Sequence, residues 1–343
     1  MKKFLLFAGI LAFMSCSTDN STDTPETPKP PIKENESGRV LFLEDDIKDR
    51  AMNLSLFDPK DDKITLLSKF DTDKYPHVYD FAVNDANKEM YAMTLGNEKI
   101  LTYNYDKKEE VSYVDLSPKN LLFDPYVSVV VADDRVVYFD SGKGGDNDER
   151  FVSVNPKTGQ IKVENESKEL VKYYKGGSCL YASIDKKNKN EIVALLYNHD
   201  FDTFEESQMT IVRLNAYNFK EFDSNTKEKI ITLKPYSEGE GKEGGFVQDK
   251  NGVFYYAFNK ASNPAKSIVT VVNPKDGSLS KVFETGAIYD IMYDELSHSL
   301  FLIAEGESDH QTMFVQYDLA KKAIIKQTPF ERKGKISELR VIK

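Results

Sequence analysis

The chain has 343 residues, a formal net charge of −10, 12% aromatic residues, no tryptophan and two cysteines. A chain of this length can bury a sizeable core, and two cysteines exclude a scaffold held together by disulfides. The negative charge repels phosphate backbones, so nucleic acid is excluded as an expected partner. Composition therefore indicates an acidic globular protein.

The N-terminal segment has the pattern of a secretory signal followed by a tether. Lys2 and Lys3 precede the apolar run Phe4 to Met14, which is too short to span a bilayer but matches a signal-peptide core. The following residues are mainly Ser, Thr, Asp, Glu and Pro, which cannot bury enough apolar surface to fold. We therefore expect a signal peptide over 1–15, a lipidated cysteine and disordered tether over 16–37, and a single folded domain over 38–343.

The end of the apolar run, Ser15-Cys16, resembles a bacterial lipobox, in which a small residue precedes a cysteine that is lipidated and becomes the first residue. The acidic start of the tether, Asp19, Asp23 and Glu26, resembles the export signals of surface lipoproteins of Bacteroidota. This resemblance implies an outer-membrane lipoprotein exposed at the cell surface and held to the membrane by its lipid anchor only. A plain secretory signal cleaved near the same point is the alternative.

From Arg39 onward the chain alternates strand-like segments with turns. Segments of about five to eight residues rich in Val, Ile, Leu, Tyr and Phe are separated by clusters of Gly, Pro, Asn and Asp. The turns Asn155 to Gly159 and Asn273 to Gly277 are near-copies, and Asp58 to Asp62 occupies the same place after an earlier strand. This recurrence predicts an internal repeat.

The repeat groups the strands into units of four, A (innermost) to D (outermost). The last segment, Ile336 to Ile342, is an A strand with no unit after it, and the first, Arg39 to Leu43, is a B strand with no A strand before it. Pairing these two closes a ring. The sequence therefore predicts an all-β, six-bladed β-propeller, with seven blades as the main alternative. A β-sandwich would not need matching unpaired strands at both ends.

The connections of such a ring divide between two faces. A–B and C–D turns share one face, and B–C and D–A loops share the other, because successive strands are antiparallel. The second set is longer and more irregular, as in Asp45 to Met52, Pro235 to Gly244 and Asn259 to Ser267. Irregular loops on a rigid scaffold are where binding usually occurs, so we place the functional surface on the B–C/D–A face.

Aromatic residues and histidines predicted on that face are the candidate ligand-binding residues. Aromatic rings can stack on a flat ligand or on sugars, and histidine can ligate a metal or haem iron. Phe201 and Phe204 lie among acidic residues in a single loop, which is consistent with a contact surface, and the alternative is a loop that packs both rings back onto its own blade. The predicted set is Tyr75, His77, Tyr126, Tyr173, Tyr174, His199, Phe201, Phe204, Tyr236 and His310.

Two groups of carboxylates raise the possibility of a metal. Oxygen ligands in the glycine-rich loop of residues 141–149 could hold Ca²⁺, although a solvated acidic turn is the alternative. The candidates in that loop are Asp146, Asp148 and Glu149. Carboxylates on inner strands could instead surround a metal in the central channel, as in a hydrolase or lactonase. The candidates there are Asp80, Asp290 and Glu338.

The tether and the predicted ring together resemble the propeller lipoproteins of Bacteroidota that accompany TonB-dependent outer-membrane transporters, within the YVTN/quinoprotein-like propeller superfamily. The resemblance implies a binding protein that captures a siderophore, haem or glycan, or docks on the transporter. The sequence has no Gly-x-Ser-x-Gly elbow and no His-Glu-x-x-His motif, so a binding role is favoured over catalysis. The metal-dependent hydrolase or lactonase stays open as the rival function.

Overall fold

The computed structural model describes residues 36–46, 51–75, 77–95, 98–117, 129–140, 150–165, 178–198, 208–215, 230–306, 311–331 and 335–343. The chain divides into two units, Met1–Lys33 and Glu34–Lys343, and every described residue belongs to the second. Within these ranges no helix has the length and apolar character that crossing a membrane requires.

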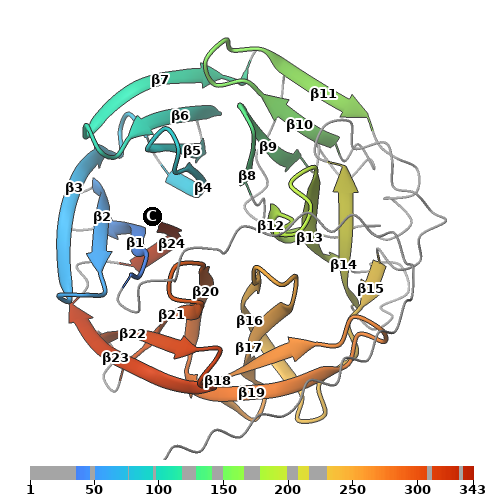
Figure 1. The fold of residues 1–343 in the computed structure, drawn as a ribbon. Helices are drawn as coiled ribbons and strands as arrows, with labels where there is room; N and C mark the ends of the chain where they lie inside the picture. The colour runs from blue at the N-terminus through green and yellow to red at the C-terminus, as the bar shows by residue number, and fades with distance from the viewer. Residues whose placement is uncertain are drawn as a thin grey trace, which may run out of the picture. The chain divides into compact units, whose positions relative to one another are not determined.

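The described residues of the second unit form six four-stranded antiparallel sheets, or blades, around a ring (Figure 1). Blade 1 contains β24 (Lys335–Ile342), β1 (Arg39–Asp46), β2 (Ala51–Asp58) and β3 (Lys63–Asp71). Blade 2 contains β4 (His77–Asn84), β5 (Glu89–Leu95), β6 (Lys99–Asn104) and β7 (Glu109–Asp115). Blade 3 contains β8 (Val129–Ala132), β9 (Arg135–Asp140), β10 (Arg150–Val154) and β11 (Ile161–Asn165).

The other three blades repeat this order from the axis outward. Blade 4 contains β12 (Ser178–Ile184), β13 (Glu191–Asn198), β14 (Gln208–Asn215) and β15 (Ile230–Thr232). Blade 5 contains β16 (Glu240–Gln248), β17 (Phe254–Lys260), β18 (Asn263–Val272) and β19 (Leu279–Gly286). Blade 6 contains β20 (Ile288–Asp294), β21 (Ser299–Glu305), β22 (Gln311–Asp318) and β23 (Ala323–Glu331). The prediction of an all-β, six-bladed ring is confirmed.

The ring is closed by the C-terminal strand. β24 pairs antiparallel with β1 along a register from Arg39–Ile342 to Asp45–Lys335, as the two unpaired strands of the sequence predicted. Blade 6 also contacts the start of β1, where the Gly38 N–H donates to Asp294 Oδ2 at 3.0 Å. A Cβ at position 38 would lie 2.5 Å from Val341 Cγ1, so glycine is needed at this junction.

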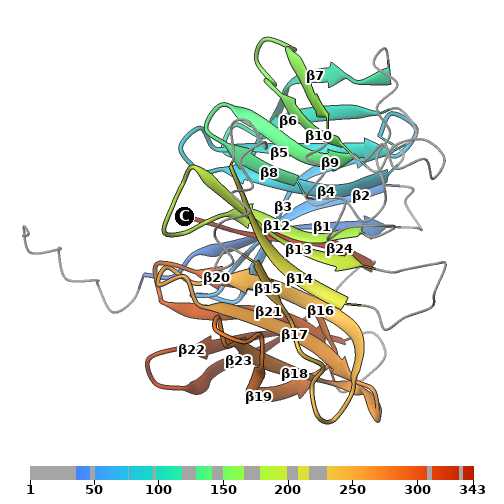
Figure 2. The same ribbon diagram turned by 90° about the vertical axis from the view of Figure 1, so that its right-hand side faces the viewer.

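The turns on the A–B/C–D face share one hydrogen-bonding pattern. An Asn or Asp at the end of the strand accepts backbone N–H groups two and three residues later, which fixes a tight turn. Asn155 Oδ1 accepts from Lys157 and Thr158 in this way, and Asn273 Oδ1 accepts from Lys275. Side chains of the turn residues therefore set the hairpins, and Figure 2 shows the turns β12–β13 and β22–β23 on the same side as the end of β24.

The hydrophobic core lies between blades and not within one central layer. Each of six buried clusters joins the facing sides of two neighbouring blades among the described residues. Between blades 1 and 6, for example, the Phe57 and Phe314 rings pack with centroids 4.8 Å apart. Every blade thus depends on both of its neighbours for burial, which explains why the ring has to be closed.

A β-bulge recurs at one place in five of the described inner strands. The register of each strand with its B strand skips one residue: Tyr79, Leu180, Gly244, Tyr289 and Ser337. A bulge re-aims the side chain that follows it. The residues directly after these bulges are Asp80, Tyr181, Gly245, Asp290 and Glu338, and we call these corresponding positions of the inner strands the axial layer.

Two of the expected irregular loops are largely strand. Pairing of β17 with β18 continues to Lys260–Asn263, so the predicted loop Asn259 to Ser267 is a hairpin with a short turn. β16 already begins at Glu240, within the predicted loop Pro235 to Gly244. The prediction was wrong there because Gly, Glu and Pro lower the apolar pattern without preventing backbone pairing at the end of a blade.

Candidate functional site

The axial layer after the bulges holds the most concentrated polar chemistry near the centre of the ring. Asp80 of β4 is 4% exposed, and each of its carboxylate oxygens accepts a backbone hydrogen bond. Oδ1 accepts from the Phe81 N–H at 2.6 Å, and Oδ2 accepts from the Val129 N–H of blade 3 at 2.7 Å. Asp80 therefore joins two inner strands.

Arg340 of the closing strand β24 completes the coordination of Asp80. Its Nη2 donates to Asp80 Oδ1 as an ion pair between blades 1 and 2, and its Nη1 donates to the Leu339 carbonyl at 2.6 Å. The guanidinium also lies over the Phe81 ring, 5.3 Å from the centroid. One carboxylate thus links blades 1, 2 and 3 at the axis.

Asp290 of β20 is the second described carboxylate of this layer. Burial raises the pKa of Asp290 to about 7, although Arg340 and a hydrogen bond from the Ile291 N–H, at 2.7 Å, oppose the rise, and Asp80 adds to it. Asp290 is half-buried, so it keeps some solvent-accessible surface although protein surrounds most of it. Asp290 can therefore change protonation near neutral pH.

Close packing of blade 5 holds Asp290 in place. Gly245 follows the bulge of β16 with a φ of +132°, and a Cβ there would lie 2.7 Å from Ile291 Cγ2 and 3.0 Å from Asp290 Oδ1. Only glycine allows β16 this close to β20. Blade 5 thus contributes backbone and no side chain to the axial layer at this position, and that backbone packs directly against the Asp290 carboxylate.

The chemistry available to this layer follows from these contacts. With both carboxylates ionised, Asp80, Asp290 and Arg340 carry one net negative charge, and protonation of Asp290 cancels it. Asp80 is fully engaged, whereas Asp290 can accept or donate a hydrogen bond or act as a general base near neutrality. Among the described residues no three His, Cys, Asp or Glu side chains lie together as metal ligands, and the side chain of Glu338 lies outside that description.

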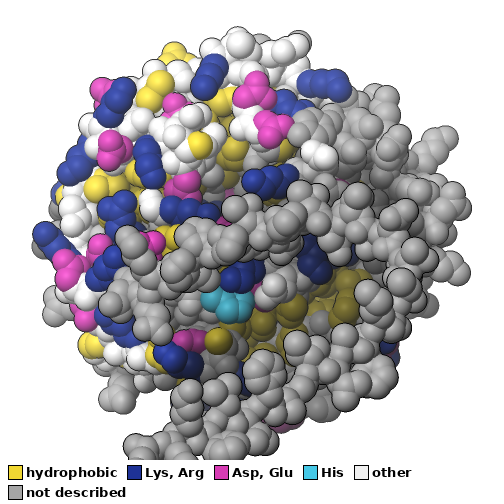
Figure 3. Space-filling model, in the orientation of Figure 1, with side chains coloured by type: hydrophobic (Ala, Val, Ile, Leu, Met, Phe, Trp, Pro, Cys, Tyr) yellow, Lys and Arg dark blue, Asp and Glu magenta, His cyan; other side chains and the backbone are white. Residues whose placement is uncertain are grey.

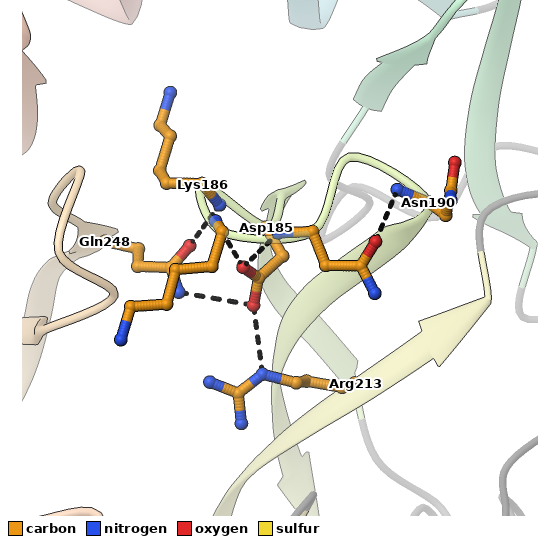
Figure 4. A network of polar contacts seen from close by, with 7 residues as sticks. Asp185, Lys186, Asn190, Arg213 and Gln248 are labelled. Atoms are coloured by element: carbon orange, nitrogen blue, oxygen red, sulfur yellow. Dashed lines mark hydrogen bonds and ion pairs between the residues drawn. The ribbon is translucent and has the colours of Figure 1, made fainter. Parts of the chain in front are cut away.

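A second polar network joins blades 4 and 5 near the A–B turns (Figure 4). Asp185, 2% exposed, accepts from Arg213 Nε at 2.9 Å and from Gln248 Nε2 at 3.3 Å. Burial opposes ionisation, but the bond from Arg213 and those from the Lys187 and Asn188 N–H groups lower the pKa of Asp185. The network links blade 4 to blade 5 through Asp185 and Gln248.

Of the predicted ligand-binding residues, two have described side chains. Tyr75 is 3% exposed, packs on Phe70 and donates its hydroxyl to Glu110 Oε2 at 2.6 Å. Tyr236 is half-buried, and its ring lies 5.4 Å from that of Phe258. These contacts anchor both rings in the cores between blades, which limits the ring surface that a ligand could reach.

The remaining predicted residues are not brought together by what the structure describes. His77 is the first residue of β4, but its side chain lies outside the described residues. The positions that lie entirely outside them are Cys16, Tyr126, Asp146, Asp148, Glu149, Tyr173, Tyr174, His199, Phe201, Phe204 and His310. The strands that flank these loop positions are described, and the ends that lead into the loops lie on the B–C/D–A face.

Sequence reasoning identified the axial carboxylates but missed how they are used. The sequence predicts Asp80, Asp290 and Glu338 as the metal-ligand candidates of the central channel, whereas the structure gives Asp80 an arginine partner and two backbone donors. A possible signal was the arginine itself, since Arg340 lies on an otherwise apolar inner strand. The bulges that align these residues cannot be predicted from the pattern of apolar residues.

Six four-stranded blades, each sharing a core with its neighbours, and a polar axial layer define a β-propeller. No protein-family model matches this chain, and no curated protein matches its sequence. Solved structures do match. TolB from Acinetobacter baumannii aligns with a TM-score of 0.57 at 11% identity, covering 88% of this chain and 66% of TolB.

Two candidate 6-phosphogluconolactonases align over their whole length. The one from Bacteroides fragilis has a TM-score of 0.55 at 10% identity and covers 92% of this chain and 100% of its own. The one from Bacteroides uniformis has a TM-score of 0.56 at 10% identity and covers 90% of this chain and 100% of its own. Identities this low show the shared β-propeller fold alone, and the chain spans only about two thirds of TolB.

Proposed function

We propose that this protein is a lipid-anchored binding protein of the cell envelope. It captures a small ligand, namely a siderophore, haem or a glycan, or docks on a TonB-dependent outer-membrane transporter, through the B–C/D–A face. The observation that carries the proposal is the difference in the length of the connections on the two faces. Apart from the β14–β15 connection, the A–B and C–D turns are tight and stereotyped, whereas most of the long connections, such as β7–β8, β9–β10, β11–β12 and β13–β14, occur on the other face.

The contacts of the axial layer support a scaffold for binding. Asp80 is occupied by Arg340, Phe81 and Val129, so the inner strands are fixed to one another across three blades. A rigid centre presents peripheral loops at a constant spacing, which lowers the entropic cost of binding. Asp290, with its accessible edge, lies at the inner end of this arrangement and would form part of the floor of a ligand site.

The proposal is tested by thermal-shift measurements on the full chain in detergent, with ferric siderophores, haemin and oligosaccharides as probes. A ligand at about 100 times its Kd adds about 2.7 kcal/mol to the stability of the native state. We expect one probe class to raise Tm, and Phe201→Ala with Phe204→Ala to remove the shift. The control is Lys157→Ala with Lys275→Ala, in turns of the opposite face.

If the protein binds only a transporter, no probe should shift Tm. The wild type should then co-purify with a TonB-dependent transporter, and the Phe201→Ala, Phe204→Ala variant should not. Absence of both results contradicts the proposal. The lipid anchor is tested separately: Cys16→Ser should move the protein from the membrane fraction to the soluble fraction. Recovery of that variant in the membrane would contradict anchoring through Cys16.

A hydrolase or lactonase is the second candidate function, favoured by one observation. Burial raises the pKa of Asp290 to about 7, and this inner-strand carboxyl keeps some solvent-accessible surface, which suits a general base. This candidate predicts lactone hydrolysis by the wild type that Asp290→Asn abolishes without loss of folding. Turnover of that kind would overturn the pure binding role, whereas equal activities in the two proteins would exclude Asp290 as the base.

A further inference from the structure

A group of buried polar residues lies between blades 1 and 6, at the end of blade 1 where β1 leads into β2. The two blades are neighbours at the lower left of the ring (Figure 1). Their junction is mostly apolar and contains Phe42, Phe57 and Phe314. Alternate residues of a strand share a face, so Glu44 and Asp46 follow Phe42 on the side of β1 that faces blade 6. Polar side chains thus continue the apolar junction toward the B–C/D–A face.

Asn53 of β2 lies beside both carboxylates. It is the register partner of Glu44, so the two side chains share one face of the blade. Its Nδ2 donates to Asp46 Oδ2 at 3.4 Å. Glu44 is 5% exposed, Asp46 6% and Asn53 1%. Two carboxylates and one amide are therefore adjacent and almost completely buried.

Thr312 of β22 faces the same region from blade 6. The Phe314 ring packs on the Phe57 ring of β2 at 4.8 Å between centroids, which places this face of β22 against blade 1. Thr312 lies two residues before Phe314, so it shares that face and is closer to the B–C end of the blade. It is fully buried. We call Glu44, Asp46, Asn53 and Thr312 the blade 1–6 polar cluster.

Two oxygens of the cluster are open. Asn53 Oδ1 and Thr312 Oγ1 have no hydrogen-bond partner among the described residues. A flipped Asn53 amide would not correct this, because Nδ2 would lose Asp46 and Oδ1 would face the carboxylate. Both carboxylates take part in further interactions, so the open positions are those of the amide and the hydroxyl. Buried polar atoms almost always have a partner, and two open ones in this cluster point to a bound species.

The chemistry of the cluster selects a cation. Its open atoms and carboxylates are oxygens that accept, and a water molecule would donate only two hydrogens and bring no charge. Oxygen-only sets of carboxylate, amide and hydroxyl groups suit a hard cation, and Ca²⁺ tolerates irregular geometry and completes its shell with water. Lys69, opposite Asn53 on β3, is exposed and lies on the solvent side. Exposed carboxylates of the A–B/C–D face, by contrast, are interspersed with Lys and Arg (Figure 3).

We propose that the blade 1–6 polar cluster binds Ca²⁺. Carboxylate oxygens of Glu44 and Asp46 hold the ion, together with Asn53 Oδ1 and Thr312 Oγ1. The ion joins β1 and β2 to β22, so it fixes the two blades between which the ring closes. The site lies on the middle strands of these blades and not in the axial layer, and it does not depend on what the B–C/D–A face captures.

The test titrates CaCl2 into the full chain in detergent, after treatment with EDTA, by calorimetry, and measures Tm with and without Ca²⁺. The site variants are Glu44→Gln and Thr312→Val. The matched control is Thr102→Val, because Thr102 on β6 is also a buried threonine, 3% exposed, whose Oγ1 has no partner among the described residues. A second control, Asp146→Asn with Asp148→Asn, removes the candidate ligands of the glycine-rich loop.

We expect Ca²⁺ at about 100 times its Kd to raise Tm by about 4 °C in a folded unit of this size. Glu44→Gln should weaken calcium binding by about tenfold or more, because it removes one of two charged ligands, and Thr312→Val by about two- to fivefold. Both controls should bind as the wild type does. If Glu44→Gln does not fold, the comparison of Thr312→Val with Thr102→Val decides. Absence of calcium binding, equal losses in those two threonine variants, or a loss in the Asp146→Asn, Asp148→Asn variant alone overturns the proposal.

Discussion

The Asp80–Arg340 pair gives the most direct test of how the ring is held closed. Arg340→Met keeps an apolar stem over Phe81 and leaves the Asp80 carboxylate without its cation. Breaking a buried ion pair from one side costs about 3–5 kcal/mol. The side chain of Arg340 is 27% exposed and that of Asp80 is 6% exposed and keeps two backbone donors, so we expect about 2–3 kcal/mol.

This cost translates into a measurable change of Tm. The folded unit Glu34–Lys343 has roughly 300 residues, which corresponds to an unfolding entropy of about 0.6 kcal/mol/K. Arg340→Met should therefore lower Tm by about 4 °C in calorimetry. The control is Lys343→Met directly after the same strand, whose ion pair with Glu295 is half exposed and should contribute less than about 1 kcal/mol.

A double-mutant cycle with Asp80→Asn separates the pair from other effects. If the two side chains act as a unit, the double variant should be more stable than the sum of the single losses predicts, by about 1–2 kcal/mol. Removal of Arg340 should also raise the pKa of Asp290, because it removes the charge that opposes the rise. Strict additivity, or an Arg340→Met variant that melts like the control, would refute the interblade role of this pair.

Three further predictions concern other parts of the ring. Deleting residues 335–343 removes from the core three aliphatic side chains that are 4% exposed or less, which costs about 1.5–3 kcal/mol each, so circular dichroism should show no cooperative unfolding; a melt like that of the full chain would contradict ring closure. The pKa of Asp290 is about 7 in the native state and 3.8 for an unperturbed aspartate, so the native state binds the extra proton and stability should fall as pH rises from about 4 to 7, by up to about 1.4 kcal/mol per pH unit. Asp290→Asn should thus gain more stability over the wild type at pH 8 than at pH 5 in urea titrations, and a gain independent of pH would show that Asp290 does not titrate there. Gly159→Ala should cost about 1 kcal/mol, whereas Gly277→Ala, with a similar φ but a Cβ only 1.8 Å from the Thr232 carbonyl oxygen, should cost at least about 1–2 kcal/mol more. Equal losses in these two matched turns would mean that the backbone at Thr232 moves freely.

The strand pattern and the closing strand could be predicted because both depend on local apolar sequence. The unpaired strands at the two ends, with Ile336 to Ile342 last, required a ring, and β24 pairs with β1 as expected. Near-identical turns at Asn155 and Asn273 gave the repeat, since the Asn side chain itself forms the turn. Strands and turns could therefore be predicted, because single residues or short segments determine them.

The axial arrangement could not be predicted because it depends on register between blades. Without the bulge after Val78, Asp80 would occupy a different position on β4, and no residue type specifies that bulge. The binding role of Tyr75 stays a prediction, because the burial of its ring against Phe70 and the bond to Glu110 involve two other parts of the chain. Contacts between residues that are distant in sequence determine both the position of Asp80 and the burial of Tyr75.

The position of β1 inside blade 1 has a mechanical consequence. This strand follows directly after Gly38 and is hydrogen-bonded on one side to β2 and on the other to β24. A pull at its N-terminal end acts along the strand, so it loads both ladders in shear at once instead of peeling an edge strand one bond at a time. A ring attached to a surface at this point would resist detachment by force, and the resistance would disappear if β24 were lost.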